Sequence, residues 1–470
     1  MKTLIGKVKW IQETGARLDS SFHLGDGRKT RKILEDSPLG TKLLSEFSSD
    51  IFYGGRARRN YVENKEKGVS FMGSSDMLKS DFESLKLVSK KLTKDLTSSM
   101  LKEGWTMISR SGTIGNTNYT TKDFIGKAAS EHIIRVVPND QIKSGYLYSF
   151  LSSKYGYALM TQGTFGAVIR HIEPEYLAGL PIPIFDKIKQ QKIHDLITEA
   201  SDLRVEANKL LRNAQKEIKT LVELPDLNKN EFEYFGNHSH DREVAVFQRN
   251  ISELSAISIN AFNYSKKVEI LENRVKQKKY KLLHECLDAN QFFSTGSFKR
   301  LELDSPTSIK LINQSDILNL KKQGKLLARA FAKTDKLAEY GEVLIAGVGT
   351  LGEGETFCRA IFVNEELEGQ LLAGEFIRMK TNEEVPSGYL FSWLSSDYGF
   401  RFIRKTQSGT KLCRPIHRLL KNIPIPILEK SQMDKIDKDV RSANKMIYDA
   451  LCKENKAISL VEKEIESWQK

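Results

Sequence analysis

The sequence SGYLYSFLSSKYGY occupies residues 144–157, and a close variant, SGYLFSWLSSDYGF, occupies residues 387–400. Ten of the fourteen positions are identical, and three more exchange one aromatic residue for another. The two stretches lie 243 residues apart. A period this long indicates a duplicated domain and not the repeat unit of a solenoid, so the fold is expected to be built twice.

The repetition extends in both directions from this stretch. The further pairs are LPIPI at 180–184 with IPIPI at 423–427, SGTIG at 111–115 with VGTLG at 348–352, SDML at 75–78 with SDIL at 315–318, and Phe22 with Phe262. The chain therefore consists of two copies, which span about residues 1–225 and 240–470.

The first part of each copy is predicted to be a mixed α/β or α+β globule, at residues 1–185 and 243–428. Short β-branched and aromatic runs, such as residues 105–108 and 342–345, alternate with Gly-containing turns and indicate strands. From Tyr146 to Leu151, apolar residues three and four apart indicate a helix.

The second part of the first copy, residues 186–222, is predicted to be one long helix. It contains no Gly and no Pro, and its apolar residues follow the alternating three- and four-residue steps of a heptad. They are Ile193, Ile197, Ala200, Ala207, Leu211, Ala214, Ile218 and Leu221, with Arg204 at one position of the series.

A second long helix is predicted for residues 429–470. Ile447 stands where the first helix has Arg204, and Glu454 stands where it has Leu211. Helices of roughly 30–40 residues, ~45–60 Å long at the usual rise, need a partner for an apolar face. We expect one antiparallel coiled coil; the alternative is two helices that each pack on their own globule. The matching apolar positions, displaced by 243 residues, are Ile436, Val440, Ala443, Ala450, Ala457 and Val461.

The composition of the 470 residues limits the class of protein. With 73 Lys and Arg against 60 Asp and Glu, the net charge of +13 suits a polyanionic partner such as nucleic acid. No run of 18 apolar residues is present, and the N-terminus does not resemble a signal peptide. Cys286, Cys358, Cys413 and Cys452 lack metal-ligand spacing, so we interpret them as buried thiols in a reducing compartment, the cytoplasm.

Motifs for catalysis or for a cofactor are weak. Residues 347–352 fit G-x-G-x-x-G, but the other copy has Arg110 in place of the first glycine, so a turn is the better interpretation. The chain has no Pro-Pro dipeptide, which the catalytic loop of a typical DNA amino-methyltransferase contains. His238 and His240 lie in the predicted linker, residues 223–242, without a third metal ligand nearby. We expect no catalytic residue, no metal and no cofactor on this chain.

Basic residues with aromatic neighbours lie mainly outside the best-repeated blocks, where they could neutralise phosphates or read guanine edges. The two Gly-Thr loops before the Pro-x-Pro blocks could offer backbone N–H groups to a phosphate or could be plain turns. The candidate DNA-binding residues are Arg56, Arg58, Arg59, Arg110, Tyr119, Gly163, Thr164, Arg170, Lys299, Arg300, Lys321, Lys322, Arg404, Lys405, Gly409, Thr410 and Arg414.

This arrangement resembles the specificity (S) subunit of Type I restriction-modification systems over essentially the whole chain. The resemblance is carried, twice and in the same order, by a Gly-Thr loop, an Ile-Pro-Ile-Pro block and a long helix. After the block, family members usually have a further proline pair and Glu-Gln. This chain has FDKI at 185–188 and LEKS at 428–431, which leaves the start of each helix open.

The resemblance implies a non-catalytic subunit with two target-recognition domains that read a split, asymmetric site in double-stranded DNA. The helices would be spacers and docking sites for methyltransferase (modification) subunits, expected to be two, and restriction subunits would join them. S-adenosylmethionine and ATP are expected on those partners. Two alternatives remain, a stand-alone DNA methyltransferase with atypical motifs and a coiled-coil adaptor that binds only proteins.

Overall fold

The computed structural model describes Val8, Ile11, Phe22, His23 and residues 25–56, 58–62, 64–82, 85–164, 171–227 and 247–469. The chain forms two compact units. Unit 1 comprises Met1–Val205 and Asp449–Lys470, and unit 2 comprises Glu206–Tyr448. Each unit thus includes part of both long helices, whereas the predicted division separated the helices from the globules.

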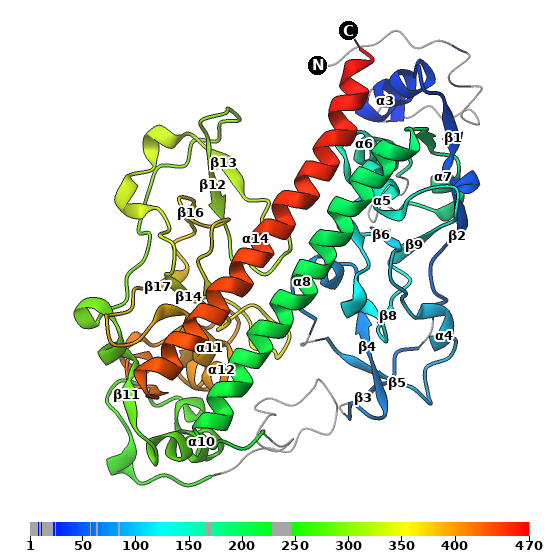
Figure 1. The fold of residues 1–470 in the computed structure, drawn as a ribbon. Coiled ribbons are helices and arrows are strands. Elements are labelled where there is room, and N and C mark those ends of the chain that lie inside the picture. The colour runs from blue at the N-terminus through cyan, green and yellow to red at the C-terminus, as the bar shows by residue number, and fades with distance from the viewer. Residues whose placement is uncertain are drawn as a thin grey trace. The chain divides into compact units, whose positions relative to one another are not determined.

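Unit 1 is built on two four-stranded sheets (Figure 1). The first is antiparallel, with the order β2 (Ser48–Phe52), β9 (Ile133–Pro138), β6 (Thr106–Ser109) and β7 (Thr117–Tyr119). The second has the order β3 (Tyr61–Val62), β5 (Leu87–Ser89), β4 (Gly68–Met72) and β8 (Ala128–Ala129), and β4 and β8 run parallel. The helices are α3 (Asp26–Glu35), α4 (Leu96–Ser99), α5 (Ser144–Ser152), α6 (Lys154–Gln162) and α7 (Pro174–Ala178), with short 3-10 turns η1 (Leu44–Glu46), η2 (Asp76–Leu78) and η3 (Lys122–Phe124).

Unit 2 repeats this arrangement with two sheets of three strands each. One has the order β15 (Ala360–Phe362), β14 (Val343–Ala346) and β17 (Phe376–Met379); the other has β13 (Lys325–Leu327), β12 (Ile309–Ile312) and β16 (Leu371–Leu372). Strands β18 (Gln407–Ser408) and β19 (Arg414–Pro415) form a small hairpin. The helices are α10 (Lys266–Lys276), α11 (Ser387–Ser395), α12 (Asp397–Lys405) and α13 (His417–Leu420), with 3-10 turns at Ile251–Glu253, Ala261–Tyr264, Leu283–Cys286, Asp288–Asn290, Arg329–Phe331 and Thr334–Lys336.

The repeated sequence blocks form the same contacts in both units. The Pro-x-Pro blocks are β10 (Pro181–Pro183) and β20 (Pro424–Pro426), which pair antiparallel with β1 (Thr41–Leu43) and β11 (Tyr280–Leu282). Two-stranded ribbons tolerate proline because they need few N–H donors. The hydroxyl of Tyr146 donates to the carbonyl of Pro183 at 2.7 Å, and that of Tyr389 donates to Pro426 at 2.7 Å. The duplication predicted from the sequence is therefore present in the structure.

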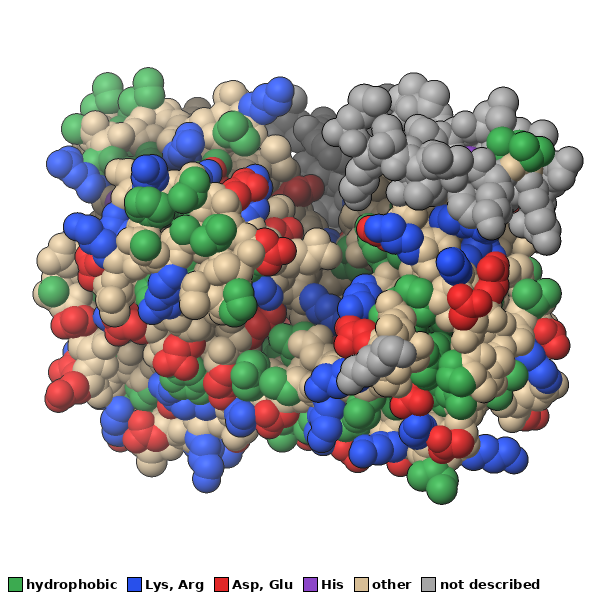
Figure 2. All heavy atoms as spheres, turned by 90° about the horizontal axis from the view of Figure 1, so that it is seen from above, with side chains coloured by type: hydrophobic (Ala, Val, Ile, Leu, Met, Phe, Trp, Pro, Cys, Tyr) green, Lys and Arg blue, Asp and Glu red, His purple; other side chains and the backbone are tan. Residues whose placement is uncertain are grey.

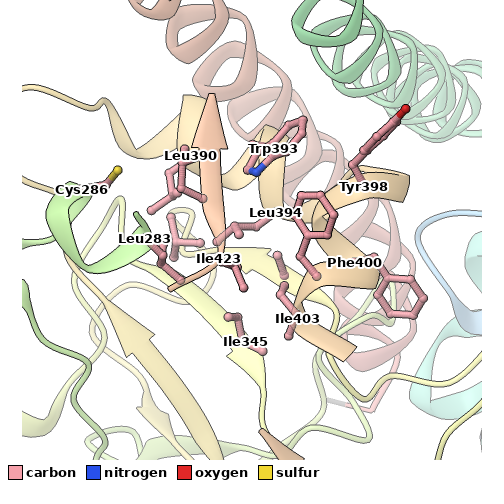
Figure 3. Close-up of a cluster of buried hydrophobic side chains, with 14 of the residues drawn as sticks. Leu283, Cys286, Ile345, Leu390, Trp393, Leu394, Tyr398, Phe400, Ile403 and Ile423 are labelled. Atoms are coloured by element: carbon pink, nitrogen blue, oxygen red, sulfur yellow. The ribbon is translucent and has the colours of Figure 1, made fainter. Parts of the chain in front are cut away.

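Glycine in the repeated Tyr-Gly pair is required by close packing. A Cβ at Gly156 or at Gly399 would collide with the backbone carbonyl of Phe150 or Trp393. In unit 2, Trp393 is part of a buried apolar cluster with Leu390, Leu394, Tyr398 and Ile403 (Figure 3). Its indole N–H donates to the carbonyl of Pro424 at 3.1 Å, which ties the helix core to the Pro-x-Pro strand.

The long helices are α8 (Lys187–Leu221) and α14 (Lys430–Ser467), which lie side by side and antiparallel (Figure 1). In unit 1, Lys189 pairs with Glu464 at 2.9 Å and Lys453 pairs with Glu199 at 2.6 Å. In unit 2, Lys435 pairs with Glu217 at 2.6 Å. The predicted antiparallel coil is therefore confirmed within each unit.

Of the apolar residues named above for the two helices, all but two are buried, and Ile447 is half-buried as well. Leu211 is half-buried, and Leu221 is 38% exposed because the helix ends there and the neighbouring Val222 is buried instead. The start of α8 is capped by Asp186, whose carboxylate accepts from the N–H of Lys189 at 2.8 Å. At the start of α14, the side chain of Gln432 accepts from the N–H of Glu429 at 3.3 Å. Over the described ranges, no helix is long and apolar enough to cross a membrane.

Candidate nucleic-acid interface

One edge of the first sheet in unit 1 gathers polar side chains, where β2 and β6 end and β9 begins. Arg110, directly after β6, donates to the carboxylate of Glu173 at 2.5 Å. Its guanidinium lies 4.3 Å from the ring centroid of Tyr53, which follows β2. The Arg110 side chain is 15% exposed, so its orientation is fixed by two neighbours while part of it reaches the surface.

Two further pairs of hydrogen-bonded side chains lie along the same edge. Arg59 pairs with Glu131 at 2.9 Å and lies over the ring of Phe71. His132, next to Glu131, has Nδ1 2.8 Å from the hydroxyl of Ser111. Burial raises the pKa of the Glu131 carboxyl, but its backbone hydrogen bond and Arg59 outweigh burial and lower it overall. Glu131 therefore stays ionised and holds Arg59 in place.

The structure places two other sequence-predicted residues of unit 1 on the surface and one in the interior. Arg56 and Arg58 are exposed. Tyr119 is 5% exposed, packs in the core of unit 1 and bonds Ser144 at 2.9 Å, so its assignment as a surface contact is corrected. Burial is the main cause that raises the pKa of Tyr119. Arg170 lies outside the described residues.

The predicted basic residues at the end of α12 are used inside unit 2. Arg404 is 3% exposed and pairs with Glu353 at 3.2 Å, together with Arg401 at 3.1 Å. The Arg404 guanidinium also lies 4.9 Å from the ring centroid of Phe400. Lys405 pairs with Glu272 at 2.7 Å. Arg404 is therefore corrected from a surface contact to a residue that fixes the loop bearing Glu353 onto α12, because its charge is already balanced within the unit.

The remaining basic candidates of unit 2 include both exposed residues and one that is buried in an ion pair. Lys299, Arg300 and Arg414 are exposed, and Lys321 is half-buried. Lys322 is 8% exposed and pairs with Glu366 at 2.8 Å, which corrects its assignment as a surface contact. Basic and acidic side chains are also interleaved over the face shown in Figure 2, so charge alone does not outline a single patch there.

The two Gly-Thr loops are not equivalent, although the sequence suggested that they were. Gly163 caps α6 with φ −76° and is buried against Tyr176, and Thr406 caps α12 in the same way with φ −81°. Gly409 instead lies in the exposed β18–β19 hairpin at φ +98°, beside Thr410. Thr164, half-buried, follows the α6 cap. Gly163 is therefore corrected to a packing position, because a Cβ there would collide with the Tyr176 ring.

The corresponding edge of unit 2 carries residues that sequence reasoning missed. Glu375, directly before β17, is exposed and accepts from the amide of Gln314 at 3.1 Å. The other end of that amide, the oxygen of Gln314, accepts from the backbone N–H of Val348 at 3.2 Å. His132 and Glu375 lie 243 residues apart, which is the period of the repeat. The period alone could therefore have identified them as equivalent positions that carry different residues.

Metal binding finds no support among the residues that the structure describes. No group of three or more His, Cys, Asp or Glu side chains in that part of the chain could hold a metal ion. The predicted linker residues His238 and His240 lie outside it. Of the four thiols, Cys286, Cys358 and Cys413 are buried as expected, but Cys452 is exposed because it lies on the outer side of α14.

The two α/β units each have a polar sheet edge and a share in an antiparallel helix pair, so the fold is a duplicated module. Residues 49–220 match the family of the Type I restriction modification DNA specificity domain. The match lies within the first copy, and the internal repeat carries the same framework into the second half of the chain. No curated protein matches the sequence.

Solved structures with related descriptions also align with the chain. The S subunit of a Type I restriction-modification system from M. genitalium is 14% identical, with a TM-score of 0.32, over 91% of this chain and 92% of that one. The HsdS subunit from Thermoanaerobacter tengcongensis is 11% identical, with a TM-score of 0.28, over 90% and 96%. A chain from work on complex assembly and conformational transition of the type I R-M system is 13% identical, with a TM-score of 0.27, over 90% and 97%. The similarity to this family rests on the sequence match at residues 49–220.

Proposed function

We propose that this chain is the non-catalytic DNA-recognition subunit of a Type I restriction-modification complex, and that each unit reads one half of a split, asymmetric site in double-stranded DNA. The observation that carries the proposal is a repeated framework with different side chains at equivalent sheet edges. The Tyr146–Pro183 and Tyr389–Pro426 hydrogen bonds are the same, whereas Arg110 in one copy corresponds to Gly347 in the other. Such a design gives two different half-sites from one fold.

The helices α8 and α14 are proposed to set the distance between the half-sites and to dock two methyltransferase subunits. In support of a docking role, a shallow hollow on unit 1 is lined by residues of both helices, among them Ile188, Leu196 and Lys456. Ile188 is 83% exposed, so it offers apolar surface to a partner at this hollow. S-adenosylmethionine and ATP would be bound by the modification and restriction subunits and not by this chain.

Salt dependence of binding by the purified chain distinguishes this proposal from a protein-binding adaptor. We expect the affinity for duplex DNA to fall steeply with salt. For each phosphate contacted, log K drops by ~0.9 when the salt concentration rises tenfold. Weak binding that salt leaves unchanged would support the adaptor. Methyl transfer from S-adenosylmethionine by the chain alone would instead support a stand-alone methyltransferase.

Sequencing of methylated bases in a host with this chain and its partner subunits tests the split site. We expect one bipartite motif, methylated on both strands. One heptad inserted into each helix, after Val205 and after Tyr448, should lengthen the preferred spacing by ~10 Å, about three base pairs. Seven residues added to the predicted linker, residues 223–242, are the matched control and should leave the spacing unchanged. Unchanged spacing in the helix variant would refute the spacer role.

A further inference from the structure

The residue directly before β9 and the residue directly before β17 occupy the same place in the two copies of the fold. The carbonyl of His132 accepts from the backbone N–H of Arg110 at 2.9 Å, and the carbonyl of Glu375 accepts from that of Gly347 at 3.2 Å. His132 and Glu375 are 243 residues apart, and Arg110 and Gly347 are each the residue after the neighbouring strand ends. One backbone arrangement therefore presents a histidine in unit 1 and a glutamate in unit 2.

Both side chains are linked to the paired turns of the fold, directly in unit 1 and through Gln314 in unit 2. His132 bonds the hydroxyl of Ser111 at 2.8 Å, and Ser111 is 7% exposed. Glu375 bonds the amide of Gln314, which is 8% exposed and is itself fixed by the N–H of Val348. Ser111 and Val348 begin the paired sequences SGTIG and VGTLG. Each exposed residue is thus oriented by a buried neighbour, which lowers the entropy cost of using it in binding.

His132 and Glu375 each keep a polar side-chain atom that can form a further hydrogen bond. The His132 side chain is 40% exposed, and its Nε2 lies 3.6 Å from Glu131, beyond hydrogen-bond distance. Glu375 is exposed, and its contact with Gln314 uses one of its two carboxylate oxygens. Both edges therefore present oriented polar atoms to a partner outside the unit.

The two edges present different hydrogen-bonding groups, donors in unit 1 and an acceptor in unit 2, and different bases match these groups. The unit 1 edge has the donors Arg110 and Arg59 beside His132, and arginine donors match the N7 and O6 acceptors of guanine. The unit 2 edge has Gly347 where Arg110 stands, and a Cβ there would lie 2.6 Å from the carbonyl of Glu375. Its exposed group is a carboxylate, which accepts from the exocyclic amino group of cytosine or adenine.

We propose that His132 and Glu375 are equivalent base-reading residues, so that the unit 1 half-site contains guanine at the contacted position and the unit 2 half-site contains cytosine or adenine. This inference rests on the proposed function, since it assumes that the units bind DNA. It assigns specificity to one position of the fold in both copies and leaves the phosphate contacts to other residues.

The test is selection of binding sites from a randomised pool of duplex DNA by the full chain. Glu375→Gln keeps the size of the side chain and an oxygen that can accept from Gln314. It should reduce the base preference at one position of one half-site by about tenfold, the discrimination that a good contact provides. His132→Gln should do the same in the other half-site only. Asp140→Asn and Glu383→Gln, exposed and also 243 residues apart, lie beyond the opposite ends of the same strands and are the matched controls.

Each outcome of the selection decides a different point. Loss of preference in one half-site for each variant, with both controls like the wild type, supports the inference. If the wild-type chain selects a bipartite motif and both variants select the same motif with the same preferences, the inference fails while the proposed function stands. If the wild-type chain selects no motif, both fail. Unchanged thermal melting of the variants shows that altered preference does not come from unfolding.

Discussion

Arg204 of α8 and Glu454 of α14 form an ion pair in unit 1, although 250 residues separate them in the sequence. Glu454 is 2% exposed and also accepts from the hydroxyl of Tyr148 at 2.5 Å. Burial and the neighbouring carboxylate raise the pKa of Tyr148. These are the residues that interrupt the apolar series of the two helices. In the repeat, their equivalents are Ile447 and Leu211, so unit 1 has charges where unit 2 has apolar residues.

Removal of one charge from this pair should destabilise unit 1 strongly. Glu454→Leu leaves Arg204 and the Tyr148 hydroxyl buried without their acceptor, and we expect a loss of about 3–5 kcal/mol in the free energy of unfolding. The double variant Arg204→Ile with Glu454→Leu copies the equivalent residues of unit 2, Ile447 and Leu211, and should recover most of that loss. Urea unfolding followed by circular dichroism measures both.

The exposed pair of Lys453 and Glu199, whose side chains are 35% and 56% exposed, supplies the control for the buried pair. Lys453→Ala should change the unfolding free energy by less than about 1 kcal/mol. A similarly small effect of Glu454→Leu would show that the buried pair does not hold the helices together.

Replacement of the repeated glycine should disturb the core of unit 2. In Gly399→Ala, the new methyl group meets the carbonyl of Trp393, and we expect a loss of about 1–3 kcal/mol from overpacking. Gly179→Ala is the control, because a Cβ there has 3.7 Å to the carbonyl of Tyr176. Thermal melting compares the two variants, and equal melting temperatures would contradict the packing argument.

Thiol labelling should distinguish one cysteine from the other three. Burial raises the pKa of Cys286 to about 12 and raises those of Cys358 and Cys413, and all three side chains are inaccessible. We expect a disulfide reagent at neutral pH to modify Cys452 quickly and the others after unfolding, since the thiolate is the reactive form. Cys452→Ser should abolish the fast phase. A fast phase that persists in this variant would show that a buried thiol is reached in the folded state.

Mild acid should weaken the contact between α8 and the start of α5. His194 accepts from the N–H of Gly145 at 3.1 Å, and burial, followed by the charge of Lys143, lowers the pKa of His194 below 6.5. A lowered histidine pKa means that the unfolded chain takes up the proton first, so stability is full above about pH 6.5 and falls as the pH drops through the folded-state pKa. The melting temperature of unit 1 should therefore decrease over that range.

The second copy provides the comparison for this pH effect. Asp437, 243 residues after His194, accepts from the N–H of Gly388 at 2.7 Å and remains an acceptor in mild acid. His194→Asp should therefore reduce the loss of stability just below pH 6.5. If the wild type and His194→Asp lose stability in parallel, protonation of His194 is not the cause.

The sequence by itself determined the features that depend on local pattern and repetition. The period of 243 residues identified the two copies, and the heptad spacing placed α8 and α14 within a few residues of their ends. Both depend on which residues are near one another in the chain, so a single sequence is sufficient. The repeat also marked the Pro-x-Pro blocks, and apolar residues three and four apart located the helix at Tyr146.

Only the tertiary structure decided which charged residues are available to a partner. Arg404, Lys322 and Arg110 look alike in the sequence, yet the first two are buried beside Glu353 and Glu366 and the third lies at a sheet edge. Their carboxylate partners are 44 to 63 residues away. Such partners are chosen by the path of the backbone and not by local spacing.

The buried arginines at equivalent positions show the same division most clearly. Arg135 and Arg378 are 243 residues apart, and both are almost fully buried. Arg378 is neutralised by Glu342 at 2.8 Å, whereas Arg135 donates to backbone carbonyls, among them that of Ile133 at 2.9 Å. The repeat in the sequence shows that both copies have an arginine at this position. What balances each charge depends on residues that only folding brings within hydrogen-bond distance, because burial of a charge requires compensation from whatever lies beside it.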